Sequence, residues 1–328
     1  MKICVFGAGS IGGLMAGLIA HAGRDVSIVA RGAHLHAIQA DGLRVRTPGG
    51  QICCRPVATD DPRALGVQDL VVVATKTTAL PQVAASIAPL LHDATLVAFA
   101  LNGVFWFYAH GMQKAVDVAG LDADGALARD IGPGRALGVV VRGSAEVGEP
   151  GLVVNSNGLQ VVVGDAIPGR MDRAVRVAKA LACPGFAAEA TADLRRAMWA
   201  KLARNVGSSP IACLTGADSW AITADRELRR IANGLRQETL AVAAAQGYPG
   251  ISLGEGQTRS PQPTKPSMLQ DLERGRPLEI ETQLSVVQDL ARQSGVATPL
   301  LDTLLPLLKL RANVAGCPPP VTLQRVDR

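Results

Sequence analysis

The stretch Lys2-Ile-Cys-Val-Phe-Gly-Ala-Gly-Ser-Ile-Gly-Gly13 decides the fold. Residues 2–6 form a short apolar run typical of a buried strand, and residues 14–22 form an alanine-rich run typical of a helix. The turn between them has the spacing G-x-G-x-x-G and consists of Gly7, Ala8, Gly9, Ser10, Ile11 and Gly12. In a dinucleotide-binding turn, these glycines permit the bend, the approach of a pyrophosphate and close helix packing. The stretch therefore predicts a Rossmann-like strand, phosphate-binding turn and helix.

The alternative is a structural glycine turn that binds nothing. The context favours a cofactor site, because the turn directly follows an apolar strand and opens a helix whose amino terminus offers free N–H groups to a phosphate. The same stretch imitates a secretory signal, since it is apolar from residue 3 to residue 20. Its glycines break the continuous apolar helix that a signal needs, so we expect a soluble cytoplasmic protein.

The end of the second expected strand, residues 25–30, indicates which dinucleotide is bound. A site selective for NAD places an acidic residue there, but this chain has Arg31, and the nearest acid, Asp25, opens the strand. A guanidinium fits the 2′-phosphate of NADP, so NADP is favoured over a merely solvated arginine. Lys76 follows the next buried strand, residues 69–74, where it either neutralises a phosphate or is an exposed loop lysine.

The order of expected elements predicts two domains and an α/β fold. Strands alternate with helices as far as Pro168, which indicates a Rossmann-like domain over residues 1–168 with a parallel sheet. Residues 151–154 and 159–164 look like a hairpin. An all-α domain is expected over residues 169–328, with helices at 170–182, 191–209, 222–246, 266–274, 277–294 and 299–312.

Composition excludes several classes of protein. The 328 residues are 48% hydrophobic and only 3% aromatic, with a net charge of +5, which excludes a disordered chain. Because basic residues are interspersed with acidic ones and aromatics are scarce, specific nucleic-acid binding is not expected. The positive net charge predicts only a mild attraction for anionic ligands. The six cysteines form no C-x-x-C pair, and His34-x-His36 is the only close histidine pair, so no metal site is expected.

Polar residues in the second half could carry the chemistry. Lys201, Asn205 and Ser209 recur at steps of four, so all three are expected on one helix face, where Lys201 could donate a proton to a reduced carbonyl. A plain solvent face is the alternative, and spacing alone favours it. Farther on, Pro277 is expected as the first residue of a helix with Glu279 in its first turn, where a carboxylate also suits the helix dipole.

Asn102-Gly103 follows the expected strand at residues 95–101, at the sheet edge where ligands bind in open α/β folds. Its amide could face the cofactor or the substrate, or the pair could be an ordinary turn. The run Val104-Phe-Trp-Phe-Tyr108 then concentrates four of the ten aromatic residues. It could form an apolar wall or lid beside the nicotinamide, or pack as an ordinary helix.

Taken together, these motifs resemble the ketopantoate reductase (2-dehydropantoate 2-reductase) family over nearly the whole chain. The segments Trp199-Ala-Lys-Leu-Ala-Arg-Asn-Val-Gly-Ser-Ser-Pro210 and Ser267-Met-Leu-Gln-Asp-Leu-Glu-Arg-Gly-Arg-Pro-Leu-Glu-Ile-Glu281 are more specific to it than the glycine turn. The resemblance implies NADPH-dependent reduction of a 2-keto acid in a cleft between the domains. It implies Lys201 as general acid, Glu279 as its partner, Asn102 on cofactor and substrate, and Asn205 and Ser267 on substrate.

The chain departs from the family pattern at two positions that bear on the substrate. Ser209 and Ser219 stand where pantoate-making members carry asparagines, which puts ketopantoate itself in doubt and keeps another small keto acid as an alternative. A non-enzymatic NADP(H) sensor is a further rival, although retention of Lys201 and Glu279 speaks against it. No nucleic acid or membrane partner is expected, and the oligomeric state stays open, with a homodimer as one option.

Overall fold

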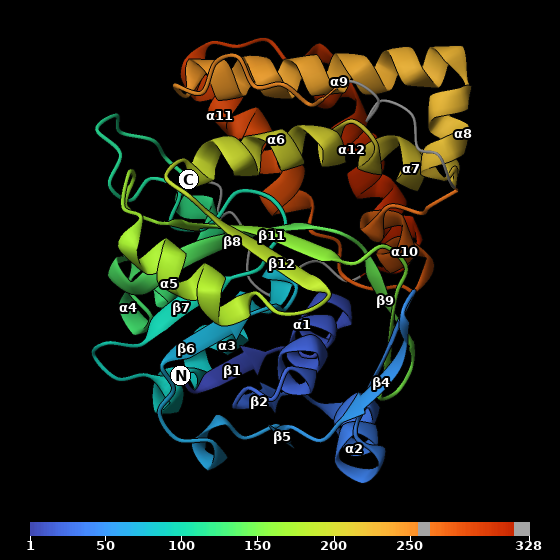
Figure 1. Ribbon diagram of the computed structural model, residues 1–328. Coiled ribbons are helices and arrows are strands. Elements are labelled where there is room, and N and C mark those ends of the chain that lie inside the picture. The colour runs from blue at the N-terminus through green and yellow to red at the C-terminus, as the bar shows by residue number, and fades with distance from the viewer. Residues whose placement is uncertain (255–262, 318–328) are drawn as a thin grey trace. The chain divides into compact units, whose positions relative to one another are not determined.

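The computed structural model describes residues 1–254 and 263–317, and the chain divides into two compact units. The first unit comprises Met1–Leu101, His110–Gln113 and Asp124–Leu194, and the second comprises Asn102–Ala109, Lys114–Ala123 and the chain from Arg195 onward. Figure 1 shows the elements of both units coloured along the chain. The segment Asn102–Ala109, which begins with the Asn102-Gly103 pair, and the segment Lys114–Ala123 thus belong with the C-terminal helices rather than with the sheet.

The first unit is built on an eight-stranded sheet in the order β12-β11-β8-β7-β6-β1-β2-β5. Neighbouring strands from β8 to β5 are parallel, while β11 runs antiparallel to β8. The strands span Ile3–Phe6 (β1), Val26–Val29 (β2), Val57–Thr59 (β5), Leu70–Val73 (β6), Leu96–Phe99 (β7), Ala136–Arg142 (β8), Leu159–Asp165 (β11) and Phe186–Thr191 (β12). Every residue of β1, β2, β6 and β7 is buried, which explains why these strands are apolar apart from Ser27 in β2.

Helices connect the parallel strands, as the expected α/β alternation requires. They span Ser10–His21 (α1), Gly32–Asp41 (α2), Leu80–Ser86 (α3), Ala126–Asp130 (α4) and Asp172–Leu181 (α5), with short 3-10 turns at Pro62–Ala64, Thr77–Ala79, Ala88–Leu90, Ala119–Leu121 and Pro133–Arg135. Helix α1 buries nearly its whole length, including Leu14, Met15 and Ile19. The Rossmann-like part of the prediction is therefore confirmed.

A second, four-stranded sheet corrects the expected hairpin of residues 151–164. It has the order β4-β3-β10-β9 and spans Leu43–Thr47 (β3), Gly50–Cys54 (β4), Ala145–Glu149 (β9) and Leu152–Asn155 (β10). Strand β10 pairs with β9 and β3, whereas β11 belongs to the large sheet. Asn155 makes this change of sheet possible: its Oδ1 accepts from the Gly158 N–H at 2.9 Å, and its Nδ2 donates to the Ser144 carbonyl at 2.7 Å.

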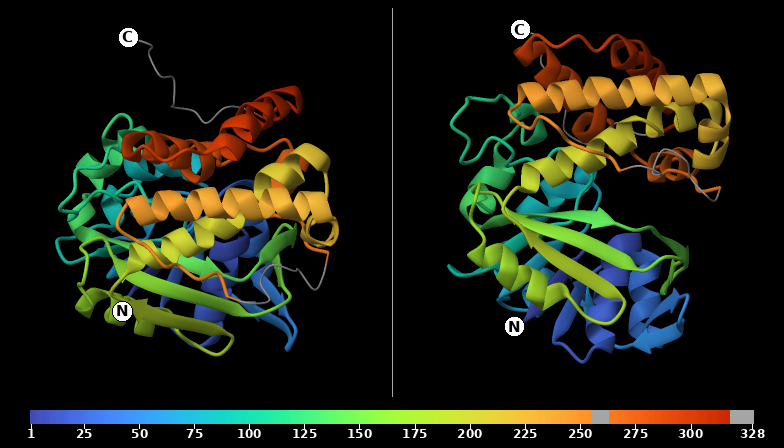
Figure 2. Two further views of the ribbon diagram at one scale, coloured as in Figure 1. Left: turned by 90° about the horizontal axis from the view of Figure 1, so that it is seen from above. Right: turned by 45° about the horizontal axis from the view of Figure 1, so that its top comes forward.

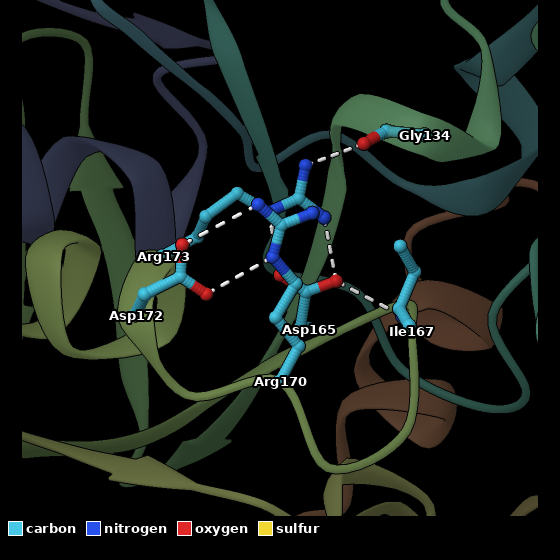
Figure 3. Close-up of polar contacts among 6 residues, drawn as sticks. All are labelled: Gly134, Asp165, Ile167, Arg170, Asp172 and Arg173. Atoms are coloured by element: carbon cyan, nitrogen blue, oxygen red, sulfur yellow. Dashed lines mark hydrogen bonds and ion pairs between the residues drawn. The ribbon is translucent and has the colours of Figure 1, made fainter.

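The first unit continues past the boundary expected at residue 168. The buried carboxylate of Asp165 pairs with the Arg173 guanidinium at 2.5 Å and accepts from the Ile167 N–H at 2.9 Å, which ties the end of β11 to α5 (Figure 3). Next to it, Arg170 and Asp172 form an exposed ion pair at 3.0 Å. The chain therefore turns back onto the same sheet at this point instead of leaving it.

Strand β12 is one of the elements that the sequence did not indicate. Its sequence, Phe-Ala-Ala-Glu-Ala-Thr, is rich in alanine and lacks the valines of the other strands, but it pairs in parallel with β11 over six residues. Together with α5 it keeps residues 169–194 in the first unit, so the compact units part after Leu194 rather than after residue 168.

The described residues of the second unit contain helices and turns and no strand, as expected. The helices span Leu194–Val206 (α6), Ser209–Thr215 (α7), Ser219–Ala224 (α8), Arg226–Ala245 (α9), Ser267–Glu273 (α10), Val286–Ser294 (α11) and Pro299–Val314 (α12), with a π-helical segment, η6, at Glu281–Ser285 (Figures 1 and 2). Glu238 of α9 accepts from the N–H groups of Leu300 and Leu301 at 2.8 and 3.0 Å, which caps α12 and joins these two helices. None of the described helices combines the length and the apolar character that crossing a membrane needs.

Candidate functional site

The glycine turn of the first unit has the close contacts that a phosphate-binding loop requires. Gly7 has φ +104°, and a Cβ there would lie 2.6 Å from Thr75 Cγ2. A Cβ on Gly12 would lie 1.9 Å from the carbonyl oxygen of Gly7, so α1 can approach the turn only because this residue has no side chain. Gly9 differs from both, because its Cβ would meet nothing within 4 Å. The backbone at Gly9 is thus open to a ligand.

The amino terminus of α1 is available to an anion. The helix begins at Ser10, Gly9 is its N-cap, and no side chain caps it and no acidic residue stands in its first turn. Its first N–H groups therefore keep hydrogen-bonding capacity, and the helix dipole adds a partial positive charge. Ser10 and Ile11 are half-buried, while Ala8 is buried beneath the turn.

Arg31 and Lys76 follow the two strands that flank this turn. Strand β1 pairs in parallel with β2 and β6, with Phe6 opposite both Val29 and Val73, so all three strands end at the same edge of the sheet. Exposed Arg31 is the N-cap of α2, and Lys76 precedes the 3-10 turn after β6. The structure thus places both cations at the sheet edge that carries the glycine turn.

The second unit contains a polar cluster around Lys201. This half-buried lysine lies in the middle of α6, and desolvation lowers the pKa of its ammonium group to about 8. The carboxylate of Glu279 raises the pKa of Lys201 and so partly offsets the effect of desolvation, whereas the nearby Arg204 guanidinium lowers that pKa further. A lysine with a pKa near neutrality can both give and take a proton at physiological pH.

Glu279 is held at this cluster by Asn102. The Asn102 Nδ2 donates to Glu279 Oε2 at 3.4 Å, and Glu279 is 5% exposed. The expectation that Pro277 begins a helix with Glu279 in its first turn is wrong: residues 276–279 are not helical, and the helical segment begins after them. Because Glu279 is not part of a helix, its side chain can interact with Asn102 and with Lys201, which belong to two other segments of the chain.

The segment after Asn102 is fixed by a contact that requires glycine. A Cβ on Gly103, which has φ +86°, would lie 2.2 Å from the carbonyl oxygen of Thr282. The N–H of the next residue, Val104, donates to that same oxygen at 2.8 Å. The Asn102-Gly103 pair is therefore a turn that packs on η6 and holds the Asn102 amide toward Glu279.

Asn205 lies one helical turn beyond Lys201 and is joined to a residue that the sequence analysis missed. Its Nδ2 donates to Gln283 Oε1 at 3.1 Å, and Gln283 is 2% exposed within η6. Only its position four residues after Glu279 could have indicated Gln283 beforehand.

Ser209 and Ser267 lie differently from Asn205. Helix α6 ends at Val206, and Ser209, which is 4% exposed, begins α7, so the expected stripe of three residues on one helix is wrong beyond Asn205. The turn arises at Gly207, where a Cβ would clash with the buried Arg236 side chain at 2.6 Å. Ser267 is exposed at the first position of α10.

The aromatic run is buried and is neither a helix nor an exposed lid. Tyr108 is 1% exposed; its ring packs edge-on against Trp199, whose Nε1 donates to the Tyr108 hydroxyl at 3.0 Å. Arg195 donates to the Tyr108 carbonyl at 2.6 and 2.8 Å, and Phe105 stacks on Phe107 with ring centroids 5.1 Å apart. These contacts join the turn after Asn102 to the base of α6, which carries Lys201.

The cysteines and the possible metal ligands of the described residues were compared with the needs of thiol and metal sites. No group of three or more histidine, cysteine or acidic residues is arranged there to hold a metal ion. The six cysteines are free, and burial raises the pKa of the Cys4 and Cys213 thiols to about 12, which makes them unreactive.

A Rossmann-like unit with an open glycine turn, combined with a helical unit bearing a desolvated lysine among amides and a carboxylate, defines a nicotinamide-dependent oxidoreductase. Two models of one family match the chain: the ketopantoate reductase PanE/ApbA model over residues 3–167 and its C-terminal counterpart over residues 193–312. The chain belongs to the ketopantoate reductase family.

Individual relatives agree with this assignment over nearly their full length. A 2-dehydropantoate 2-reductase of Mesorhizobium japonicum is 40% identical, with 97% of this chain and 99% of the relative covered. A ketopantoate reductase candidate from Ralstonia solanacearum MolK2 has a solved structure with a TM-score of 0.88 at 35% identity, covering 96% of this chain and 98% of the other. The 2-dehydropantoate 2-reductase of Geobacter metallireducens GS-15 has a TM-score of 0.83 at 28% identity, covering 94% and 99%.

Proposed function

We propose that this enzyme reduces 2-dehydropantoate to pantoate with NADPH, the step that supplies pantoate for pantothenate. The observation that carries the proposal is the desolvated Lys201, with Asn205 on the same helix and Glu279 acting on its charge. Family relatives named 2-dehydropantoate 2-reductase support the choice of substrate.

When bound at the glycine turn, NADPH would supply a hydride to the carbonyl carbon of the keto acid. The protonated Lys201 then gives its proton to the carbonyl oxygen as negative charge develops there, so the C=O bond becomes CH–OH. Glu279 keeps the lysine protonated at neutral pH, because its carboxylate raises the pKa of Lys201. Asn102 orients Glu279 and is proposed to contact both cofactor and substrate.

The first unit is proposed to hold the cofactor. The turn formed by Gly7, Ala8, Gly9, Ser10, Ile11 and Gly12 would bind the pyrophosphate, a role that the open space at Gly9 and the uncapped α1 support. Arg31 and Lys76 would bind the 2′-phosphate and a backbone phosphate of NADPH, since both follow strands that flank the turn.

Asn205, Ser209 and Ser267 are proposed to hold the substrate. The second candidate function is reduction of another small keto acid by the same chemistry, and one observation favours it: Ser209 and Ser219 give this chain shorter hydroxyl side chains at the start of α7 and of α8. The reaction type is the same for both candidates.

The test is a panel of keto acids assayed with the wild type and with Lys201→Met. We expect the wild type to oxidise NADPH with 2-dehydropantoate, and the variant to lose roughly 100-fold or more in kcat while binding NADPH normally in a fluorescence titration. Unchanged turnover in the variant would disprove the role of Lys201. A wild type that binds NADPH but reduces no keto acid would identify the chain as a cofactor-binding sensor.

We also propose that the enzyme works in the cytoplasm as a homodimer. Helix α12 exposes Leu307, Leu310 and Val314 at steps of three and four residues, which forms an apolar stripe on one face. Sedimentation of the wild type and of Leu310→Lys tests the dimer. The wild type should sediment as a dimer and Leu310→Lys as a monomer, and a monomeric wild type would refute the proposed dimer.

A further inference from the structure

His34 lies in the first unit between the glycine turn and the small sheet. It is the third residue of α2, whose N-cap is Arg31. Its ring Nδ1 accepts a hydrogen bond at 2.9 Å from the N–H of Gly151, which stands in the turn between β9 and β10. The ring Nε2 is buried and has no hydrogen-bond partner among the described residues. One side of the ring is thus bonded, and the other offers a buried polar atom.

The hydrogen bond from Gly151 determines which ring nitrogen of His34 carries the proton. A neutral imidazole has one N–H and one acceptor nitrogen, so a ring that accepts at Nδ1 carries its proton on Nε2. Burial lowers the pKa of His34 below its usual 6.5, which keeps the ring neutral at pH 7. Nε2 is therefore a buried N–H donor, and leaving such a group unpaired costs free energy.

The Gly151 backbone, which holds the ring, is itself fixed from two sides. Its carbonyl accepts from the Arg44 N–H of β3 at 2.8 Å, and its φ is +77°. A Cβ on Gly151 would lie 3.0 Å from the Ala37 Cβ, so the turn between β9 and β10 lies directly against α2. The His34 ring is therefore held in place by a peptide that belongs to the small sheet.

The acceptor that acts on this ring is the Ala8 carbonyl of the glycine turn. It raises the pKa of His34, an effect that burial outweighs, without completing a hydrogen bond to Nε2 in this structure. Because Nδ1 carries no proton, only Nε2–H can donate to it. A Cβ on Gly13 would lie 3.3 Å from the Ala8 carbonyl oxygen and 2.8 Å from Val153 Cγ2 of β10. The Ala8 carbonyl thus points into the layer between α1 and the small sheet.

We propose that His34 is a positioning residue of the cofactor site, which holds the Ala8–Gly9 peptide in the orientation that binds the pyrophosphate. In a planar trans peptide the C=O and the N–H point in opposite directions, and the described chain contains no cis peptide bond. When Nε2–H donates to the Ala8 carbonyl, the Gly9 N–H therefore faces the other way, toward the open space beside Gly9. The bond from Nε2 closes when the dinucleotide docks there. This inference rests on the proposed cofactor role of the turn.

Two amide substitutions separate the two contacts of the ring. In His34→Gln the amide nitrogen can reach the position of Nε2, whereas in His34→Asn the amide oxygen takes the place of Nδ1 and nothing reaches Ala8. We expect Kd for NADPH, from fluorescence titration, to rise roughly 10-fold in His34→Asn and to stay within about 3-fold in His34→Gln. Kd for NADH should rise by the same factor, because both cofactors carry the pyrophosphate. At saturating NADPH, kcat should stay within about 2-fold, since the contact affects binding and not the chemical step.

The control is His36→Asn, because His36 is exposed on the same helix. It should leave both dissociation constants and the melting temperature unchanged. A spectroscopic measurement on the wild type covers the case in which His34→Asn does not fold. Nitrogen NMR of the imidazole rings should show His34 protonated on Nε2 alone, with its Nε2–H signal moving downfield when NADPH binds. The signal that is absent from His34→Gln identifies His34.

Equal losses of NADPH affinity in His34→Asn and His34→Gln, or no loss in either, would overturn the positioning role of His34. A ring protonated on Nδ1, or an Nε2–H signal that NADPH does not move, would overturn it as well. A loss confined to NADPH would refute it in favour of a contact with the 2′-phosphate. Failure of the proposed function would look different, because the wild type would then still bind NADPH at the turn but reduce no keto acid.

Discussion

The Asn102 side chain donates to the Glu279 carboxylate at 3.4 Å, although the two residues are 177 positions apart in the chain. Asn102 occupies the turn before Gly103, and Glu279 occupies a non-helical stretch just before the π-helical segment that Gly103 contacts. The carboxylate that controls the charge of Lys201 is therefore oriented by a backbone contact, and changes to that contact should affect the cluster.

Gly103→Ala should destabilise the second unit and impair catalysis. Its Cβ would lie 2.2 Å from the Thr282 carbonyl oxygen, in a backbone conformation that side chains rarely adopt. We expect a loss of at least about 2 kcal/mol in the free energy of unfolding, measured by urea denaturation. Gly120→Ala is the matched control, because a Cβ there meets nothing within 4 Å. Equal effects of the two substitutions would show that the contact with Thr282 is not what requires glycine.

The pH dependence should follow the Lys201 ammonium group. Reduction needs its protonated form, so kcat/KM should fall as the pH rises through about 8, and the reverse oxidation should rise over the same range. The carboxylate of Glu279 raises the pKa of Lys201. Glu279→Gln removes this carboxylate, so the falling limb of the kcat/KM profile should move to lower pH. Glu281→Gln, whose carboxylate pairs with Lys309 at 3.3 Å, should leave the limb in place. A limb that stays at the same pH in Glu279→Gln would contradict the assignment.

Two glycines of the cofactor turn should respond in opposite ways to alanine. Gly12→Ala should lower the melting temperature, because its Cβ would overlap the Gly7 carbonyl oxygen. Gly9→Ala should keep the melting temperature, since its Cβ meets open space, yet weaken NADPH binding at least about 10-fold by occupying the position of the phosphates. Fluorescence titration and thermal melting separate the two effects. Normal NADPH affinity in a folded Gly9→Ala protein would argue against a phosphate at this turn.

Arg31→Asp should change cofactor preference without harming the fold. Aspartate is a good helix N-cap, which is the position of Arg31 at the start of α2. We expect Kd for NADPH to rise about 10- to 100-fold through loss of a charge-assisted phosphate contact, and Kd for NADH to change by less than about 3-fold. Arg176→Asp, an exposed change on α5, serves as the control for net charge. Equal losses for both cofactors would contradict a contact with the 2′-phosphate.

Local sequence patterns predicted the elements that depend only on local interactions. The apolar strands β6 and β7 and the glycine turn were readable because their apolar runs and glycine spacing are contiguous in the chain. Strand β12 was not, because its alanines favour no particular structure and only pairing with β11 makes it a strand. The compact unit extends past residue 168 for the same reason: the buried pair of Asp165 and Arg173, which returns the chain to the sheet, is a tertiary contact.

By itself the sequence determined the fold class, the glycine turn and the residue types of the site, since each rests on spacing along one segment. Only the tertiary structure decided that α6 stops before Ser209, that the aromatic run is buried against Trp199, and that Gln283 joins Asn205. The physical reason is common to all three: burial, close backbone approach and hydrogen bonds between distant segments determine which side chains meet. The pKa of Lys201 likewise depends on neighbours that no single segment contains.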